Sequence, residues 1–166
     1  MTQRRLGYQD VQAILGQIEN ASSPREILEC IGAYCSPVLG AKGYTMFRYL
    51  HASGEVERIH SSDPKAYPVG GRKRTQDYPQ SQAILAKGEV YIAKDEADIR
   101  ETYRDADLIL SIGVTSIMNV PVRLMGKNVG AINVLGVAGQ FTKENADDGR
   151  TLAGLMLPAV LRWDAD

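Results

Sequence analysis

Two asparagines in the C-terminal half of the chain have side chains whose chemistry suits ligand binding. Asn119 and Asn133 each interrupt an apolar segment that we predict to be a β-strand, residues 114–122 and 129–135. Asparagine is disfavoured within strands, and a buried amide needs hydrogen-bond partners. Each amide offers two donors and an acceptor oxygen, which suits an uncharged or a carboxylate ligand. The alternative is a structural role, such as bonding to a loop backbone, and it is preferred for Asn119.

The alternation of side chains along a strand assigns the residues of these segments to faces. In the 129–135 segment, one alternate set is wholly small or apolar: Gly130, Ile132 and Val134. Such a set suits a face covered by helices, so Asn133 should point to the opposite face. On the 114–122 segment, the residues expected on the same side as Asn133 are Thr115, Ile117 and Asn119.

A loop with two glycines and a run of cations is the second candidate ligand element. It contains Tyr67, the pair Gly70-Gly71 and then Arg72 and Lys73. Glycine permits a close approach of backbone to a ligand. Arg72 and Lys73 could close over an anion, and arginine binds carboxylates and phosphates through two parallel donors. A solvated run of charges is the alternative.

The cysteines and histidines of the chain do not predict a metal site or a disulfide bond. Cys30 and Cys35 are five residues apart on a predicted helix and point to different faces. His51 and His60 lie on a predicted hairpin without an evident third metal ligand. Tyr44, at the start of that hairpin, is a candidate pocket residue, with core packing as the alternative.

The elements that must position these residues follow from hydrophobic spacing and from turn and cap signals. Ser23 is the expected N-cap of a helix that begins at Pro24, with Glu26 completing a capping box. We predict, in chain order, helices at 8–19 and from 24 to about 40, strands at 44–50 and 55–61, a polar loop at 63–76, a short helix at 81–86, a short strand at 90–93, helices at 95–103 and 107–112, strands at 114–122 and 129–135 joined by a turn at 126–128, and a last helix at 142–163 kinked at Pro158.

Length and composition set limits on the kind of protein. The chain has 166 residues, enough for one domain with a real core, and we expect a single domain at 1–166. Its formal net charge is −1, with the charges interspersed, so no nucleic-acid partner is expected. No apolar run reaches the length of a membrane span, and no apolar segment follows the N-terminal arginines, so we expect a cytoplasmic protein without a membrane partner.

The stretch from Ser116 to Asn145 resembles the closing half of a GAF domain, a small-molecule-binding module of sensor proteins. The matching positions are Ser116, 119–122 (NVPV), 130–134 (GAINV) and 141–142 (FT). The resemblance extends to Gly40–Ser62 and Ser81–Ile92, and to the 61–73 loop of small stand-alone GAF proteins. It implies an α+β fold: a central, mostly antiparallel sheet with the N- and C-terminal helices on one face and loops and short helices over a pocket on the other.

The resemblance also implies a function, a sensory or regulatory module that binds a small molecule and acts without a fused output domain. On this interpretation the ligand-binding residues are Asn133, Asn119, Ile117, Thr115, Tyr67, Arg72, Lys73 and Tyr44. Tyr67 and Lys73 would belong to the lid of the pocket. GAF-like modules often pair through their first and last helices, which implies a homodimer here, with an apolar patch from Leu15, Leu161 and Trp163.

The alternative function is a small GAF-fold enzyme acting on a small metabolite. Free methionine-R-sulfoxide reductase is rejected, because residues 107–115 contain no cysteine and the strand positions at which that enzyme places acidic residues carry Ile117 and Asn133. Another reaction could use Asp95, Asp105 or Asp107 as a base, although these aspartates are more simply interpreted as helix caps and solvated residues. A purely structural interaction protein is the third alternative.

No cofactor is expected. A bilin needs a cysteine in the pocket region for its thioether link, and the resemblance places none there. Haem needs an axial histidine on a pocket element, and both histidines lie on the first hairpin. Cyclic nucleotide binding stays open: Phe141 and Asp147 match its signature loosely, while the asparagine–lysine pair that begins it is absent.

Overall fold

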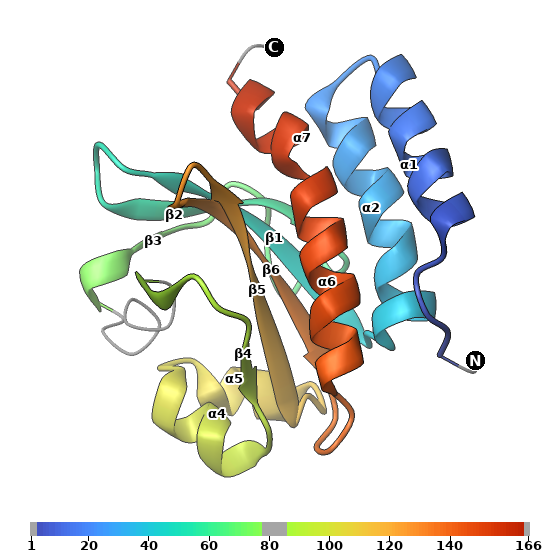
Figure 1. The fold of residues 1–166 in the computed structure, drawn as a ribbon. Helices are drawn as coiled ribbons and strands as arrows, with labels where there is room; N and C mark the ends of the chain where they lie inside the picture. The colour runs from blue at the N-terminus through green and yellow to red at the C-terminus, as the bar shows by residue number, and fades with distance from the viewer. Residues whose placement is uncertain (1–2, 78–85, 165–166) are drawn as a thin grey trace.

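The structure is a computed structural model that describes residues 3–77 and 86–164. The N-terminal part of the chain forms two helices, α1 (Tyr8–Asn20) and α2 (Pro24–Leu39) (Figure 1). Ser23 caps α2 as expected, its hydroxyl accepting the N–H of Glu26 at 3.4 Å. The predicted capping box is not formed, because the Glu26 carboxylate accepts the N–H of Ser22 at 2.9 Å. The helix ends at Gly40, whose φ of 69° is a left-handed conformation that glycine adopts without strain.

The described residues form one six-stranded sheet in the order β3-β2-β1-β6-β5-β4, and each neighbouring pair is antiparallel. The strands are β1 (Gly43–Leu50), β2 (Glu55–Ser61), β3 (Arg72–Arg74), β4 (Tyr91–Ala93), β5 (Ser116–Leu124) and β6 (Lys127–Gly136). Only β3 was not predicted: the sequence indicated a polar loop there. Because β1 and β6 lie at the centre, segments from both halves of the chain meet side by side (Figure 1).

The turn between β5 and β6 differs from the expected one. Met125 and Gly126 both have positive φ, 49° and 78°, as in the two-residue turns that match the twist of antiparallel strands. Lys127, predicted to lie in the turn, is the first residue of β6 and pairs with Leu124. The observed turn is therefore at 125–126 rather than 126–128.

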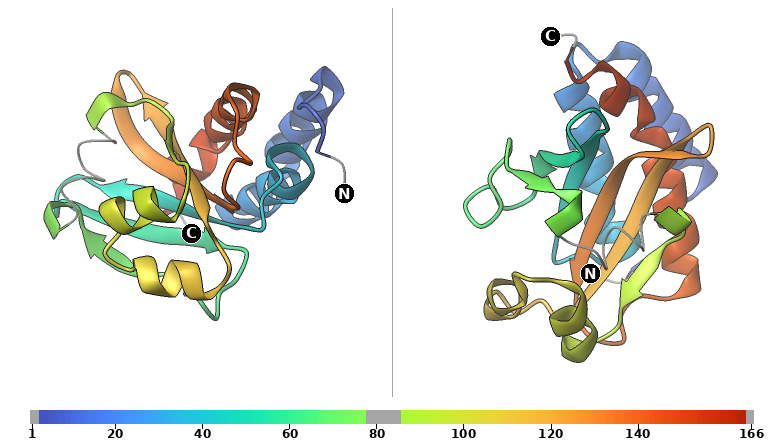
Figure 2. Two further views of the ribbon diagram at one scale, coloured as in Figure 1. Left: turned by 90° about the horizontal axis from the view of Figure 1, so that it is seen from below. Right: turned by 90° about the vertical axis from the view of Figure 1, so that its left-hand side faces the viewer.

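The terminal helices cover one face of the sheet. Here α2 packs with α6 (Lys143–Leu155) and α7 (Leu157–Arg162), and α1 packs on α2 (Figures 1 and 2). A buried cluster unites these helices with the sheet residues Met118, Val120, Ile132 and Val134. The predicted single helix with a kink is instead two helices that meet at Met156. Pro158 lies in the first turn of α7, where its missing N–H is not needed.

The opposite face carries α4 (Glu96–Thr102) and α5 (Ala106–Ser111), with η1 (Thr75–Asp77) following β3 (Figure 2). Asp95 caps α4 as expected, accepting the N–H of Asp98 at 3.0 Å. A second buried cluster forms here and includes Ile117 and Leu135 of the sheet and Ile109 of α5. The predicted helix at 81–86 falls almost wholly outside the described residues.

The fold class is thus α+β, with helices segregated by face as predicted. The two core clusters also confirm the faces inferred from strand alternation, since Ile132 and Val134 belong to the helix-covered cluster and Ile117 to the other. Within the described ranges, no helix combines the length and apolarity needed to cross a membrane.

Candidate functional site

A cavity of about 50 Å³ lies against the sheet face opposite the terminal helices. Strands β1, β2, β3, β5 and β6 contribute to it, together with the loop before β3 and the segment that leads into α5. Its apolar walls are Phe47, Ile109, Ile117 and Leu135. Its polar side chains are those of Thr45, Arg58, Tyr67, Lys73, Tyr103, Asp105 and Asn133.

Arg58 faces this cavity from β2, and the strand carries one extra residue directly after it. Phe47 of β1 pairs with Arg58 and Met46 pairs with His60, so Ile59 has no partner on β1. Such a β-bulge changes which side chains face which side. Arg58 faces the cavity and Ile59 enters the helix-side core, as in any strand, but after the bulge His60 lies on the helix side as well and stacks on the ring of Tyr44.

The Arg58 guanidinium is buried between two aromatic rings. Only 7% of the residue is exposed, and the guanidinium carbon lies 5.2 Å from the ring centres of both Phe47 and Tyr67. Nη1 donates to the carbonyl of Pro68 at 3.0 Å, while Nε has no hydrogen-bond partner among the described residues. Loss of solvation lowers the pKa of Arg58, although an arginine remains charged near neutral pH.

Tyr67 is the second buried polar residue of the cavity. The loop that carries it is shaped by Asp63, whose carboxylate accepts the N–H groups of Lys65 and Ala66 and whose carbonyl accepts that of Tyr67. The Tyr67 hydroxyl is shielded from solvent and, like Nε of Arg58, has no hydrogen-bond partner within the described chain. Burial is the main cause that raises the pKa of this hydroxyl, so it is a neutral donor at physiological pH.

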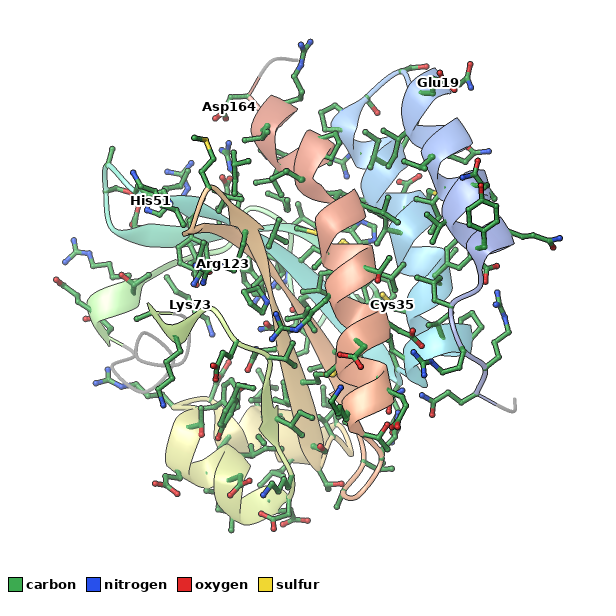
Figure 3. The ribbon with its side chains drawn as sticks, in the orientation of Figure 1. Glu19, Cys35, His51, Lys73, Arg123 and Asp164 are labelled. Atoms are coloured by element: carbon green, nitrogen blue, oxygen red, sulfur yellow. The ribbon has the colours of Figure 1, made fainter. Side chains whose placement is uncertain are left out.

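An ion pair crosses the rim of the cavity. Lys73 Nζ of β3 lies 3.0 Å from a carboxylate oxygen of Asp105, the residue before α5. Each of these side chains is about one third exposed. In Figure 3, Lys73 lies on the side of the sheet away from Cys35, which is buried in the helix-side core. The pair therefore links an edge strand to the short helices that cover this face.

A chain of hydrogen bonds orients Asn133. Asn119 and Asn133 are directly paired across β5 and β6, and Nδ2 of Asn119 donates to Oδ1 of Asn133 at 2.5 Å. Tyr103 donates its hydroxyl to Oδ1 of Asn119. Burial raises the pKa of Tyr103 strongly, so this hydroxyl keeps its proton. Because the oxygen of Asn133 is already an acceptor, its NH₂ group is the part left to donate toward the cavity.

Charge and hydrogen-bonding capacity at the cavity are unbalanced. Its described lining contains two cations, Arg58 and Lys73, and one carboxylate, Asp105, which leaves a net charge of +1. The donors of Arg58, Tyr67 and Asn133 are not matched by acceptors of the lining, since Asp105 is paired with Lys73. The arrangement therefore favours a ligand that brings negative charge and acceptor atoms.

No protein-family model and no curated protein matches this sequence. Solved structures do match. The GAF domain of a phosphoenolpyruvate-protein phosphotransferase from Coxiella burnetii is similar with a TM-score of 0.77 and 15% identity, over 95% of this chain and 94% of that one. The chain has the GAF fold. The GAF domain of the Acinetobacter phosphoenolpyruvate-protein phosphotransferase gives a TM-score of 0.74 at 12% identity, over 95% of this chain and 93% of that one. The phycoerythrobilin-bound GAF domain from a cyanobacterial phytochrome gives a TM-score of 0.71 at 14% identity, over 97% of this chain and 98% of that one.

The structure brings together five of the eight residues predicted from the sequence. Tyr67, Lys73, Ile117 and Asn133 line the cavity of this GAF fold. Asn119 lies one hydrogen bond behind Asn133, so the structure gives it an orienting role. That these residues bind a ligand is a prediction from the sequence.

The other three predicted residues lie away from the cavity lining. The hydroxyl of Thr115 accepts the N–H of Ala138 in the loop after β6. Arg72 pairs with Glu57 at 3.6 Å, because alternation along β3 points it to the side opposite Lys73. Tyr44 lies on the helix-covered face: a Cβ added to Gly32 of α2 would lie only 2.2 Å from its hydroxyl. The cavity therefore does not include these three residues.

Sequence reasoning considered Asp105 only as a catalytic base. It missed six other lining residues: Arg58, Phe47, Thr45, Tyr103, Ile109 and Leu135. The signal for Arg58 was an arginine in the middle of a predicted strand, beside an isoleucine destined for the core. The signal for Asp105 was weaker, because its partner Lys73 is 32 residues away in sequence. Of the other aspartates considered as bases, Asp95 caps α4 and Asp107 pairs with Arg100 at 2.7 Å on the surface.

Proposed function

We propose that this chain is a small-molecule-binding sensory module whose ligand occupies the cavity at Arg58 and Tyr67. One observation carries the proposal: two buried polar groups, Nε of Arg58 and the hydroxyl of Tyr67, face one cavity and have no hydrogen-bond partner in the described structure. Buried polar groups are nearly always hydrogen-bonded, because leaving one unpaired costs about 1–3 kcal/mol. A ligand with acceptor atoms would pair both groups at once.

The fold and the cavity size support a small ligand. One of the similar GAF domains is phycoerythrobilin-bound, so this fold can hold a small molecule. The cavity of about 50 Å³ is far below the roughly 300–1,000 Å³ of pockets that enclose drug-sized ligands. In this conformation it is too small for a cyclic nucleotide, which the sequence left open. The ligand proposed is therefore a compound of a few non-hydrogen atoms.

The test compares two tyrosines on opposite faces of the sheet. A library of small metabolites is screened by thermal shift, and each hit is retested on Tyr67→Phe and on the matched control Tyr44→Phe. Each variant removes one hydroxyl, but only that of Tyr67 belongs to the cavity. We expect Tyr67→Phe to weaken binding by about tenfold, the effect of one buried hydrogen bond, and Tyr44→Phe to leave it unchanged. A library without hits, or hits insensitive to Tyr67→Phe and Asn133→Ala, would overturn the proposal.

We further propose that two copies pair through their terminal helices. The support is apolar exposure: Leu15 of α1 is 44% exposed and Leu161 of α7 is 56% exposed, and both helices contact α2 in the outer layer. Trp163 contributes less than expected, since it is partly buried against the core. Sedimentation velocity of the wild type and of Leu161→Glu tests this proposal, with a monomeric wild type as the contradicting result.

A further inference from the structure

We propose that the cavity binds a short-chain carboxylate and that Arg58 is the residue that holds its anionic group. The inference rests on the proposed function, because it names the class of ligand for the same cavity. It depends on three features that the lining residues show together: an arginine edge without a partner, a surplus of donors with net positive charge, and an apolar wall close behind them.

The first feature is the free edge of the Arg58 guanidinium. Nη1 is fixed by the carbonyl of Pro68, and the rings of Phe47 and Tyr67 lie at equal distances from the guanidinium carbon. Side chain and loop therefore hold the guanidinium plane in place, and the edge formed by Nε and Nη2 stays available. Two parallel N–H donors on one edge match the two oxygens of a carboxylate.

The second feature is the electrostatic balance around that edge. An unpaired charge buried in a protein is costly unless a counter-charge is close. Asp105 is the carboxylate among the described lining residues. Its charge favours the charged form of Arg58, but it lies 3.0 Å from Lys73 and makes no hydrogen bond to Arg58. A bound carboxylate would be the counter-ion of Arg58. The Tyr67 hydroxyl and the NH₂ of Asn133 supply further donors to the same cavity.

The third feature limits the length of the ligand. A water-sized probe occupies about 10–15 Å³, so a cavity of about 50 Å³ has room for a group equivalent to a few waters. The side chains of Ile109, Ile117 and Leu135 complete the lining and offer contact to a methyl or short alkyl group. Acetate, propionate and isobutyrate have this combination of a planar anion and a small apolar tail.

The experiment compares acids with their neutral amides by NMR. The ¹H–¹⁵N spectrum of the protein is titrated with acetate, propionate and isobutyrate, and separately with acetamide, propionamide and isobutyramide, at constant ionic strength in a buffer free of carboxylates. The Nε–H signal of Arg58, assigned by its loss in Arg58→Met, reports directly on the proposed contact. We expect saturable shifts with at least one acid and binding of the matched amide at least about tenfold weaker, because the charge-assisted bonds are lost.

Two variants separate the specific site from a general effect of charge. Arg58→Met keeps a long, unbranched side chain between the two rings and should fold, while weakening carboxylate binding by about 10- to 100-fold. Arg72→Met removes one positive charge nearby, but on the opposite side of β3, and should change binding by less than about twofold. Should Arg58→Met fail to fold, Arg58→Lys replaces it: the charge stays, the two-donor edge is lost, and binding should still weaken.

The outcomes distinguish this inference from the proposed function. If amides bind as tightly as acids, or if the Arg58 variants bind carboxylates like the wild type, the carboxylate inference is wrong while the small-molecule function stands. The same holds if neither panel binds but another compound from the metabolite screen binds in a manner sensitive to Tyr67→Phe. If nothing binds in either experiment, both proposals fail.

Discussion

Two polar side chains of this protein, Asn119 and Asn133, show how a sheet can aim a hydrogen-bond donor at a cavity. Their direct pairing across β5 and β6 brings the amides into contact, and the hydroxyl of Tyr103 fixes the orientation of the first amide. Each group in this chain of hydrogen bonds donates to the next, so the oxygen of Asn133 is the last acceptor and its NH₂ group is left to donate toward the cavity. Asn119 is therefore the positioning residue, and Asn133 the residue that would contact a ligand.

At the scale of residues, this chain of hydrogen bonds predicts that replacing the two asparagines lowers the free energy of unfolding by different amounts. Asn119→Ala removes the partner of both the Tyr103 hydroxyl and the Asn133 oxygen, so it should lower the free energy of unfolding by about 1–3 kcal/mol. Asn133→Ala leaves one amide of Asn119 unpaired and should cost about 1 kcal/mol. Urea denaturation measures both, with the exposed Asn20→Ala as control. An equal or larger loss for Asn133→Ala would show that the chain does not run in this direction.

Sequence alone could predict this asparagine pair but not the surroundings of Arg58. Strand alternation is a local property, so it placed Asn119 and Asn133 on one face without knowledge of the rest of the fold. Alternation along β2 puts Arg58 on the face opposite Ile59 without help from the bulge. Its burial depends on Phe47 of β1 and on Tyr67 of the loop before β3, whose ring centres lie 5.2 Å from the guanidinium carbon. The arginine in the middle of a predicted strand was visible in the sequence, but its contacts with two other segments of the chain were not.

At the scale of elements, the turn between β5 and β6 holds a strained residue. Met125 has a φ of 49° and is 92% exposed, so its side chain contributes little packing to offset the cost of the left-handed conformation. The turn prefers asparagine followed by glycine, and Gly126 is already in place. Met125→Asn should therefore raise the free energy of unfolding by about 0.5–1 kcal/mol.

Thermal and urea denaturation of Met125→Asn check this prediction against Met125→Ala. Alanine removes the same side chain but keeps the left-handed strain, so that control should show no gain. If both variants stabilise the protein equally, the gain comes from removing an exposed apolar side chain, and the strain argument is wrong.

The elements that the sequence predicted well have strong local signals, and the others do not. Helices α1 and α2 show apolar residues at helical spacing, and α2 has a cap and a proline at its start. Strand β3 has three cationic residues and forms because β2 offers an edge, pairing Lys73 with Val56. That pairing points Lys73 to the cavity and Arg72 away, so the cation that lines the site could not be chosen before the strand was known.

At the scale of the whole molecule, a short N-terminal segment joins three helices. Before α1 begins, the amide of Gln3 and the backbone N–H of Arg4 donate to carbonyls at the end of α2, Val38 and Pro37, at 3.1 and 3.0 Å. The guanidinium of Arg5 makes two bonds, of 2.8 and 2.9 Å, to the buried Asp148 of α6. These contacts join the first residues to a helix more than 140 positions later. The helical layer behind the sheet is therefore closed by polar contacts as well as by its apolar core.

The last contact of this segment predicts how the molecule responds to acid. Asp10 of α1 accepts hydrogen bonds from the Arg4 guanidinium and from the N–H of Gly7, and these bonds lower the pKa of its carboxyl to about 2. An aspartate in an unfolded chain has a pKa near 3.9. A folded pKa below the unfolded one means that the carboxylate stabilises the fold fully above about pH 4 and loses this contribution as the pH falls toward 2.

Asp10→Asn should therefore lower the urea midpoint at pH 7, and the difference from wild type should shrink steadily between about pH 4 and pH 2. Glu19→Gln, which removes an exposed carboxylate at the far end of the same helix, is the matched control and should show a smaller difference at pH 7. A difference for Asp10→Asn that stays constant down to pH 2 would mean that the variant acts through lost packing or an altered helix start. The ionised carboxylate would then not be what holds the N-terminal segment against the helical layer.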